Sequence, residues 1–190
     1  MKNKVICISR MYGSSGDEMA YLLGEQLHIP VYEKNSYWEI YLSRGMRLGA
    51  PGNANMRDES ILMFSRDYEI PLTAFQIQSQ EIIRLASKGD CIILGRCADW
   101  ILRECDVSIL RVFIAASTEE HIRYLREHGE TSNVRAKRKA RQINLLRKDY
   151  YEKYTHQSWG AEKTYDLYIS QDEIGMDHAV QMIADRFSQL

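Results

Sequence analysis

Apolar residues in this chain follow two alternating patterns. Short unbroken apolar runs predict strands buried on both faces, because a strand inside a parallel sheet has no polar side. Between these runs, apolar residues recur every three or four positions, which predicts amphipathic helices. The expected strands cover 4–9, 29–32, 91–94, 109–115 and 165–170, and the expected helices cover 16–28, 35–43, 71–88, 98–104, 117–128, 133–155 and 174–190.

This alternation predicts an α/β fold with a doubly wound, mainly parallel sheet of about five strands. A length of 190 residues suits a single domain, 1–190, with a buried core. Ligands of such sheets bind beyond the carboxyl ends of the strands. At the end of the second expected strand, Tyr32 and Lys34 are therefore candidate substrate-binding residues. The other strand ends fall at 10–16, 95–99 and 116–117.

One segment departs from both patterns. Residues 44–59 contain three glycines, a proline and three arginines, with little apolar periodicity. This composition predicts a surface loop. In a compact domain such a loop is often a flap over a functional site, and an insert without a role is the alternative.

The composition is that of an ordinary globular protein, with 45% hydrophobic residues, 27% charged residues and a net charge of −1. This balance gives no general support for binding nucleic acid or a membrane surface. No run approaches the roughly 20 apolar residues of a membrane span, and the N-terminus lacks the features of a signal peptide. We therefore expect a cytoplasmic protein without a membrane partner; a homo-oligomer stays open.

The four cysteines are Cys7, Cys91, Cys97 and Cys105, and no two of them form a C-x-x-C pair. Two of them lie in apolar, strand-like runs. Buried reduced thiols are the expectation, rather than metal ligands or disulfides.

The first candidate site is the small-residue loop between the first strand and the first helix. Gly13, Ser14, Ser15 and Gly16 stand where backbone N–H groups can converge on an anion at a helix N-terminus. The phosphate-loop pattern G-x-x-x-x-G-K-[ST] places a lysine after its last glycine, whereas Asp17 and Glu18 follow here. A plain turn that uses small residues for steric reasons is the alternative.

The second candidate is a basic segment within the expected helix 133–155. Seven of the fourteen residues from Arg135 to Lys148 are cationic and none is acidic. On a helix, Arg138 and Arg141 are neighbours three residues apart, as are Asn144 and Arg147. Guanidinium groups match phosphate oxygens with paired hydrogen bonds. A solvated helix face and a nucleic-acid surface are the alternatives.

Two further segments are weaker signals. Arg96 follows the third strand and Asp99 comes three residues later, so the pair can hold a phosphate or a polar base. A helix-capping turn with a surface ion pair is the alternative. The aromatic residues of 148–160 can stack on a base, but such rows more often dock a helix.

Taken together, these segments resemble the cytidylate kinase-like family of P-loop nucleoside monophosphate kinases. The likeness extends over nearly the whole chain, and no single segment would carry it. Its carriers are Ile8-Ser9-Arg10 with 13–16, then 29–34, then Gly95-Arg96-Cys97-Ala98-Asp99, then 150–155 with Trp159-Gly160, and Tyr165-Asp166-Leu167.

The resemblance implies a three-layer P-loop kinase fold and transfer of the γ-phosphoryl group of ATP to CMP or a similar monophosphate, with Mg²⁺ as a cofactor. The loop 13–16, with Asp17 and Glu18 beside it, would bind the donor phosphates. Arg96 and Asp99 would face the acceptor, near an acceptor-binding insert at about 35–70. An arginine-rich lid at about 129–148 would bring in catalytic arginines. The candidates for these are Arg138, Arg141 and Arg147, and no side chain is put forward as a direct metal ligand.

The chain also departs from the family pattern. Ser15 replaces a glycine, Asp17 stands where a basic or small residue is typical, and Asn144 stands where the lid-side helix usually has an aspartate. Arg10, at the mouth of the first strand, is a candidate replacement for the missing loop lysine. These departures leave a rival hypothesis open, a nucleotide-binding regulatory module with weak or no catalysis.

Overall fold

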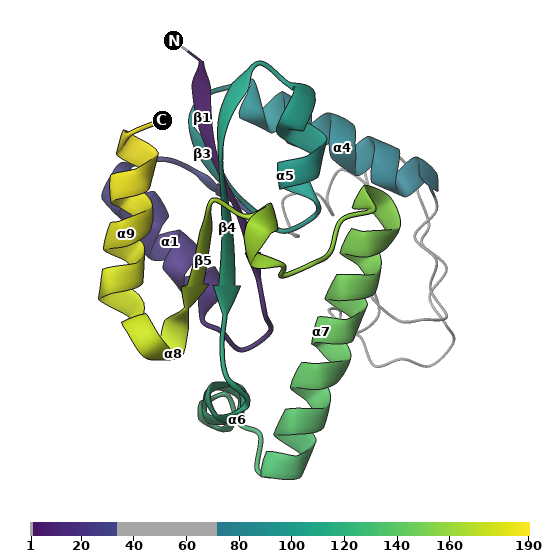
Figure 1. The fold of residues 1–190 in the computed structure, drawn as a ribbon, viewed down its shortest axis with the longest axis vertical. Helices are drawn as coiled ribbons and strands as arrows, with labels where there is room; N and C mark the ends of the chain where they lie inside the picture. The colour runs from purple at the N-terminus through teal and green to yellow at the C-terminus, as the bar shows by residue number, and fades with distance from the viewer. Residues whose placement is uncertain (1, 34–71) are drawn as a thin grey trace.

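The computed structural model describes residues 2–33 and 72–190. Within these residues the chain forms a five-stranded sheet with helices on both faces (Figure 1). In chain order the elements are β1 (Asn3–Arg10), α1 (Gly16–Leu27), β2 (Val31–Tyr32), α4 (Leu72–Ala86), β3 (Cys91–Leu94), α5 (Ala98–Ile101), η2 (Leu102–Glu104), β4 (Val107–Ala115), α6 (Thr118–Glu127), α7 (Asn133–Thr155), η3 (Glu162–Thr164), β5 (Leu167–Ser170), α8 (Gln171–Ile174) and α9 (Met176–Ser188).

All strand pairs are parallel, in the order β2-β3-β1-β4-β5. The central strand β1 pairs with β3 and β4 along its two edges, and helices pack over both of its faces. This explains its unbroken apolar run from Val5 to Ile8, all of which is buried. Because the strands are parallel, the segments that follow them meet at one edge of the sheet.

Two hydrophobic clusters hold the layers together. On one face, α1 and α9 pack on the sheet through a cluster that includes Met19, Leu23 and Ile183. On the other face, α4 and α5 pack through a cluster that includes Ile82 and Ala98. Figure 1 shows the two helix pairs on opposite sides of the strands. The predicted α/β architecture with a parallel sheet is confirmed.

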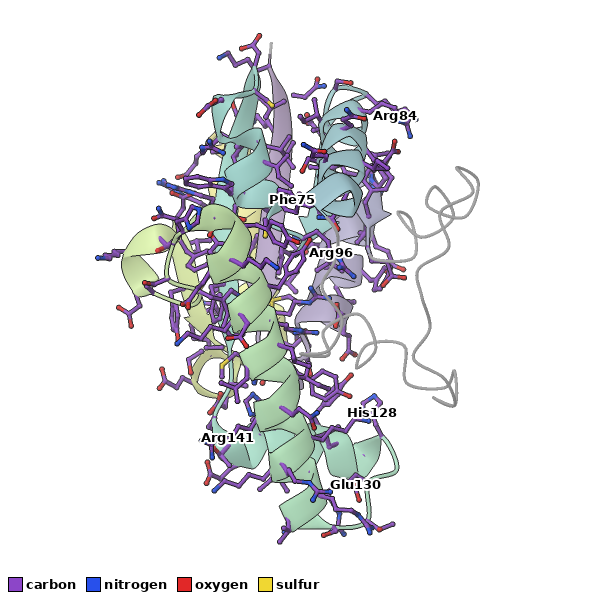
Figure 2. All side chains as sticks on the ribbon, turned by 90° about the vertical axis from the view of Figure 1, so that its right-hand side faces the viewer. Phe75, Arg84, Arg96, His128, Glu130 and Arg141 are labelled. Carbon is purple, nitrogen blue, oxygen red and sulfur yellow. The ribbon has the colours of Figure 1, made fainter. Side chains whose placement is uncertain are left out.

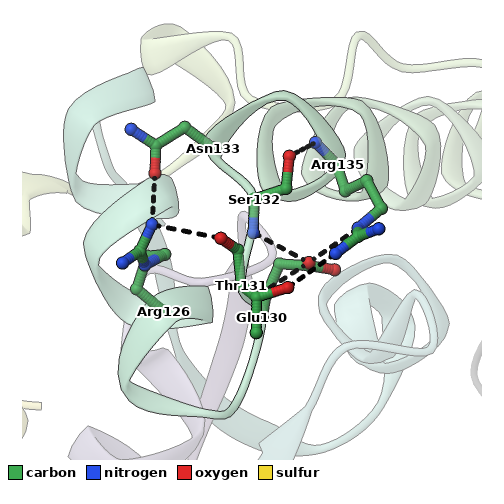
Figure 3. A network of polar contacts seen from close by, with 6 residues as sticks. All are labelled: Arg126, Glu130, Thr131, Ser132, Asn133 and Arg135. Carbon is green, nitrogen blue, oxygen red and sulfur yellow. Dashed lines mark hydrogen bonds and ion pairs between the residues drawn. The ribbon is translucent and has the colours of Figure 1, made fainter.

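The helix α6 and the N-terminal part of α7 lie beyond the carboxyl edge of the sheet, and α7 then runs back alongside it (Figure 1). The turn between them is held by polar contacts (Figure 3). The Glu130 carboxylate accepts from the backbone N–H groups of Thr131 and Ser132 and pairs with Arg135 at 3.0 Å. Ser132 caps α7 by accepting from the Arg135 backbone N–H group. Arg126 of α6 also donates to the Asn133 side chain at 3.1 Å, so the N-terminus of the long basic helix is fixed to α6.

Most expected elements lie within a few residues of their observed bounds, and α7 has the predicted range. Two expected helices differ in detail. The expected helix 98–104 is helical over its whole range but consists of α5 and the short 3-10 helix η2. The expected helix 174–190 corresponds to α9, and the short helix α8 precedes it. Gly175, with a positive φ of 82°, separates the two.

Two further expectations can be compared with these residues, and four lie outside them. Cys7, Cys91 and Cys97 are buried free thiols and Cys105 is half-buried, as expected for reduced cysteines. Among the helices within 2–33 and 72–190, none is both long and apolar enough to cross a bilayer. Lys34, the expected helix 35–43, the loop 44–59 and the insert 35–70 lie outside the described residues.

The central strands predict where stability is most sensitive. We expect Ile92→Ala to lower the free energy of unfolding by about 2–5 kcal/mol, because Ile92 is fully buried on β3 and truncation leaves a cavity. Ile83→Ala, at a position 42% exposed on α4, is the matched control. Urea unfolding measures both variants, and equal losses would contradict the assignment of the core.

Candidate functional site

Two loops follow the carboxyl ends of β1 and β3 beside the candidate site. Residues 95–97 of the second loop line its pocket, whereas residues 13–16 of the first do not. In the first loop, Gly13 and Ser15 have φ values of 74° and 54°, and α1 begins at Gly16. The second loop contains three successive positive φ values, 63°, 61° and 58°, at Gly95, Arg96 and Cys97. Left-handed backbone is costly for residues with a side chain, so both loops are held in place by their surroundings.

Arg10 passes between these two loops. A Cβ atom placed on Gly16 would lie 2.8 Å from Cβ of Arg10, and one placed on Gly95 would lie 2.8 Å from its Nη1. The close approach of the Arg10 Cβ atom requires glycine at 16, whereas a side chain at 95 would displace the end of the Arg10 side chain and would also be strained by the positive φ. The expected catalytic candidate Arg10 lies directly beside the small-residue loop.

Arg10 is paired with the first of the two unexpected acids. Its Nε and Nη2 donate to Asp17 Oδ1 at 3.0 and 2.6 Å. Burial acts to raise the pKa of Asp17, but the charges of Arg10 and Arg147 outweigh it and lower that pKa below its ordinary value. Asp17 is thus an ionised partner of the arginines, whereas Glu18 is exposed.

Arg147 reaches the same place from α7. Its Nη1 donates to the backbone carbonyl of Arg10 at 2.8 Å, and its guanidinium lies 5.7 Å from the centre of the Tyr12 ring. Burial and the charge of Arg10 lower the pKa of Arg147. An arginine nevertheless stays protonated at neutral pH, so the lowered pKa marks a site crowded with positive charge.

These groups surround a pocket of about 270 Å³, which we call the arginine pocket. Arg10, Arg96 and Arg147 come to it from three different segments, and Asp17 and Glu33 supply carboxylates. The full lining is Ser9, Arg10, Tyr12, Asp17, Glu33, Leu94, Gly95, Arg96, Cys97, Arg147, Tyr150, Tyr151 and Trp159. The pocket is therefore suited to an anion that carries several negative charges.

Asn144 joins α7 to the small-residue loop. Its Oδ1 accepts from the Tyr12 backbone N–H group at 2.7 Å. Within the loop, the Ser14 hydroxyl donates to the carbonyl of Met11 at 2.9 Å. One of the loop's N–H groups is thus already used by α7, and the loop conformation depends on where α7 docks.

Arg96 and Asp99 lie on the same turn but face different surroundings. Arg96 lines the arginine pocket, and its carbonyl accepts from Gln78 Nε2 at 3.2 Å. Asp99 does not line that pocket; its Oδ2 accepts from the Tyr151 hydroxyl at 2.6 Å. The structure therefore does not bring the two predicted acceptor ligands together in one cavity.

The remaining candidates lie outside the arginine pocket. Tyr32 is half-buried and packs against the α4–α5 cluster. Arg138 and Arg141 are exposed on α7. Arg138 is nine residues before Arg147, so at about 100° per residue it points to the opposite side of the helix. Figure 2 shows Arg141 projecting away from the side on which Arg96 lies. The catalytic roles of both residues stay predictions.

The comparisons with known proteins agree with this arrangement. A model described as the cytidylate kinase-like family matches residues 5–173. The chain belongs to the cytidylate kinase-like family. None of the curated proteins matches the chain.

Solved kinase structures share the fold of this family member. The APS kinase of Mycobacterium tuberculosis, in complex with AMPPNP and APS, superposes with a TM-score of 0.56 at 15% identity, over 100% of this chain and 99% of that one. The shikimate kinase of Bacteroides thetaiotaomicron gives a TM-score of 0.55 at 11% identity, over 99% of both. An uncharacterised protein of Eubacterium ventriosum ATCC 27560 is more similar, with a TM-score of 0.77 at 23% identity over 98% of this chain and 99% of that one.

Two contributors to this site were missed in the sequence. Tyr12 lies inside the small-residue loop and lines the pocket with its ring. Gln78 is only 3% exposed and donates to both the Arg96 carbonyl and the Tyr150 hydroxyl. The signal for Gln78 was a polar residue on the apolar side of an amphipathic helix, since a buried amide needs partners.

The Asp17 environment predicts a pH-dependent stability. An acid whose pKa is lowered by folding stabilises the native state above its unfolded pKa, and this contribution is lost as the pH falls through the folded pKa. We therefore expect Asp17→Asn to be less stable than the parent at pH 7 and to approach it near pH 3.

Chemical unfolding at both pH values measures this difference. Glu18→Gln is the matched control, because Glu18 is exposed on the same turn of α1. If Asp17→Asn were as stable as the parent at pH 7, the ion pair with Arg10 would contribute nothing to the free energy of unfolding.

Proposed function

We propose that this family member is an ATP-dependent phosphotransferase of the nucleoside monophosphate kinase type, with CMP or a similar monophosphate as acceptor. The observation that carries the proposal is the convergence of Arg10, Arg96 and Arg147 on one pocket at the N-terminus of α1. Family membership supports the same reaction class.

The donor phosphates are assigned to the loop 13–16. Backbone N–H groups at the start of a twelve-residue helix favour an anion, and the helix dipole adds to that preference. Arg10 supplies the cation that a loop lysine provides in other kinases. Its ion pair with Asp17 holds the guanidinium at the base of the loop.

The chemistry asks little covalent help from the protein. An oxygen of the acceptor phosphate attacks the γ-phosphorus, and the bond to the bridging oxygen breaks, so that ADP leaves with that electron pair. Negative charge spreads over the transferred group, and fixed cations stabilise it. In this proposal Arg147 faces the transferred group and Arg96 faces the acceptor phosphate.

Mg²⁺ fits the pocket as a cofactor shared with the donor phosphates. It usually keeps several waters and takes only one or two carboxylates beside phosphate oxygens. Asp17 and Glu33 are the carboxylates that line the arginine pocket, and Asp17 is the residue that would hold the ion. When bound, Mg²⁺ neutralises charge on the β- and γ-phosphates.

Two observations favour a second function, a nucleotide-binding module with weak or no catalysis. The Arg10–Asp17 pair already neutralises one of the pocket's cations. The Tyr12 N–H group already donates to Asn144, so it has a partner within the protein. In this alternative the chain binds a nucleotide without turning it over efficiently.

The two functions are separated by measuring turnover and binding on the same protein. The experiment follows ADP formation from ATP and Mg²⁺ with each common nucleoside monophosphate, and calorimetry measures binding of the same ligands. Turnover with at least one acceptor supports the kinase, whereas binding without turnover supports the module. If the protein shows neither turnover nor binding, both proposed functions are overturned.

Arg147 provides a direct test of the catalytic assignment. We expect Arg147→Ala to lower kcat by about 100-fold, as expected for the loss of one preorganised group that stabilises transition-state charge. Arg186→Ala, on α9, is the matched control because Arg186 does not line the arginine pocket. A kcat for Arg147→Ala close to that of the parent would show that Arg147 does not contact the transferred group.

Arg10 is tested by binding instead. We expect Arg10→Ala to weaken ATP binding by about tenfold or more, the effect of losing one charge-assisted contact of about 1.5–3 kcal/mol. Arg10→Lys keeps the charge and should lose less. If Arg10→Ala binds ATP and turns over as well as the parent, Arg10 does not replace the loop lysine.

A further inference from the structure

The contact between Asp99 and Tyr151 joins the two segments that carry Arg96 and Arg147. Asp99 is 7% exposed and Tyr151 is 4% exposed. The tyrosine hydroxyl donates to Asp99 Oδ2 at 2.6 Å, the length of a strong hydrogen bond to a carboxylate. Such a buried bond is costly to break, because it leaves a charged acceptor without its partner.

Asp99 is not placed to meet the ligand of the arginine pocket. The hollows that it lines are two others, of about 320 and 290 Å³, and both contain Arg103 and Arg111. Burial raises the pKa of Asp99, and the hydrogen bond from Tyr151 only partly offsets this rise. The Asp99 carboxyl group is thus buried and hydrogen-bonded to Tyr151.

The spacing on both sides of this contact is regular. Tyr151 is four residues after Arg147 on α7, so the two side chains lie on the same face one turn apart. Asp99 is in the first turn of α5, three residues after Arg96. The hydrogen bond therefore lies one helical turn from Arg147 and three residues from Arg96, and it joins the two segments that carry these arginines.

Two further hydrogen bonds, both donated by Gln78, join the neighbouring tyrosine of α7 to the same segment. Gln78 Nε2 donates to the Arg96 carbonyl at 3.2 Å and to the Tyr150 hydroxyl at 3.0 Å. The adjacent tyrosines of α7 thus connect to the same turn, one through α4 and one directly. The C-terminal half of α7 is docked against the strand end that presents Arg96.

We infer that Asp99 and Tyr151 are positioning residues that hold Arg147 opposite Arg96, and that Asp99 is not a ligand of the acceptor nucleotide. This inference rests on the proposed function for its catalytic readout. It assigns the two residues a shared role: Tyr151 donates, Asp99 accepts, and the distance between two arginines from different elements is fixed as a result.

The test compares two conservative variants. Asp99→Asn keeps an oxygen that can accept from the Tyr151 hydroxyl, so we expect kcat and the acceptor KM to stay within about threefold of the parent. Tyr151→Phe removes the donor, and we expect kcat to fall by about tenfold, because a small displacement of a catalytic group is costly. A nucleotide ligand at Asp99 predicts the reverse, with a raised acceptor KM in Asp99→Asn and little effect of Tyr151→Phe; that result would overturn the inference.

A double-mutant cycle shows whether Tyr151 acts through Arg147. If it does, Tyr151→Phe lowers kcat about tenfold in the parent but less than twofold in Arg147→Ala, because the positioned group is then absent. Equal effects in both backgrounds would assign Tyr151 a purely structural role and contradict the inference. Ile143→Val, at a buried position on α7, is the matched control for loss of stability alone.

The inference stays testable if the parent proves to have no kinase activity. The same cycle is then measured on ATP binding by calorimetry, with the same expected coupling between Tyr151 and Arg147. Absence of turnover in the parent argues against the proposed kinase, whereas absence of coupling in either readout argues against the positioning pair. The two failures are therefore distinguishable.

Discussion

The crowding of three guanidinium groups around one small pocket is the constraint on which the rest of this structure depends. Arg10, Arg96 and Arg147 come from three segments that are distant in sequence. Like charges in a partly buried space repel one another, and Asp17 offsets part of this repulsion by pairing directly with Arg10. The left-handed turns, the glycines beside Arg10 and the docking of α7 all serve to hold these charges together. Such an arrangement is costly for stability unless an anion or a carboxylate offsets the repulsion.

The helix α7 performs two tasks on one face. Its C-terminal half contacts the small-residue loop through Asn144 and Arg10 through Arg147. The same half reaches the segment after β3 through Tyr150 and Tyr151. Its N-terminal half instead packs on α6 through Leu125, Ala136 and Ala140. The basic residues on its outer side, including Arg138 and Arg141, make no part of the arginine pocket. The helix thus carries one arginine that lines the pocket, Arg147, and others that are exposed to solvent on a different side.

The fold was largely predictable from the sequence, because buried parallel strands leave unbroken apolar runs such as that of β1. The place of the site was predictable too, since parallel strands bring their carboxyl ends to one edge. The directions of the side chains were not. Arg96 and Asp99 are three residues apart, yet one lines the pocket and the other meets Tyr151, because Arg96 and Cys97 adopt left-handed backbone that no spacing rule reveals. The pairing of Arg10 with Asp17 was likewise not predictable, because it depends on how the Arg10 side chain passes between Gly16 and Gly95.

That path links sequence positions that are far apart in the chain. Gly16 has an ordinary helical backbone, so only the bulk of Arg10 excludes a side chain there. Gly95 is restricted twice, by its positive φ and by the guanidinium 2.8 Å from its missing Cβ atom. The atom met at 16 is the Cβ of Arg10, which every residue except glycine carries, so shortening the side chain at 10 would leave that contact in place. A side chain gained at 95 would instead meet only the end of the flexible Arg10 side chain and displace it from Asp17. The two glycines therefore protect different features of the molecule. Gly16 preserves the close approach of α1 to the end of β1, and Gly95 preserves the position of one guanidinium group.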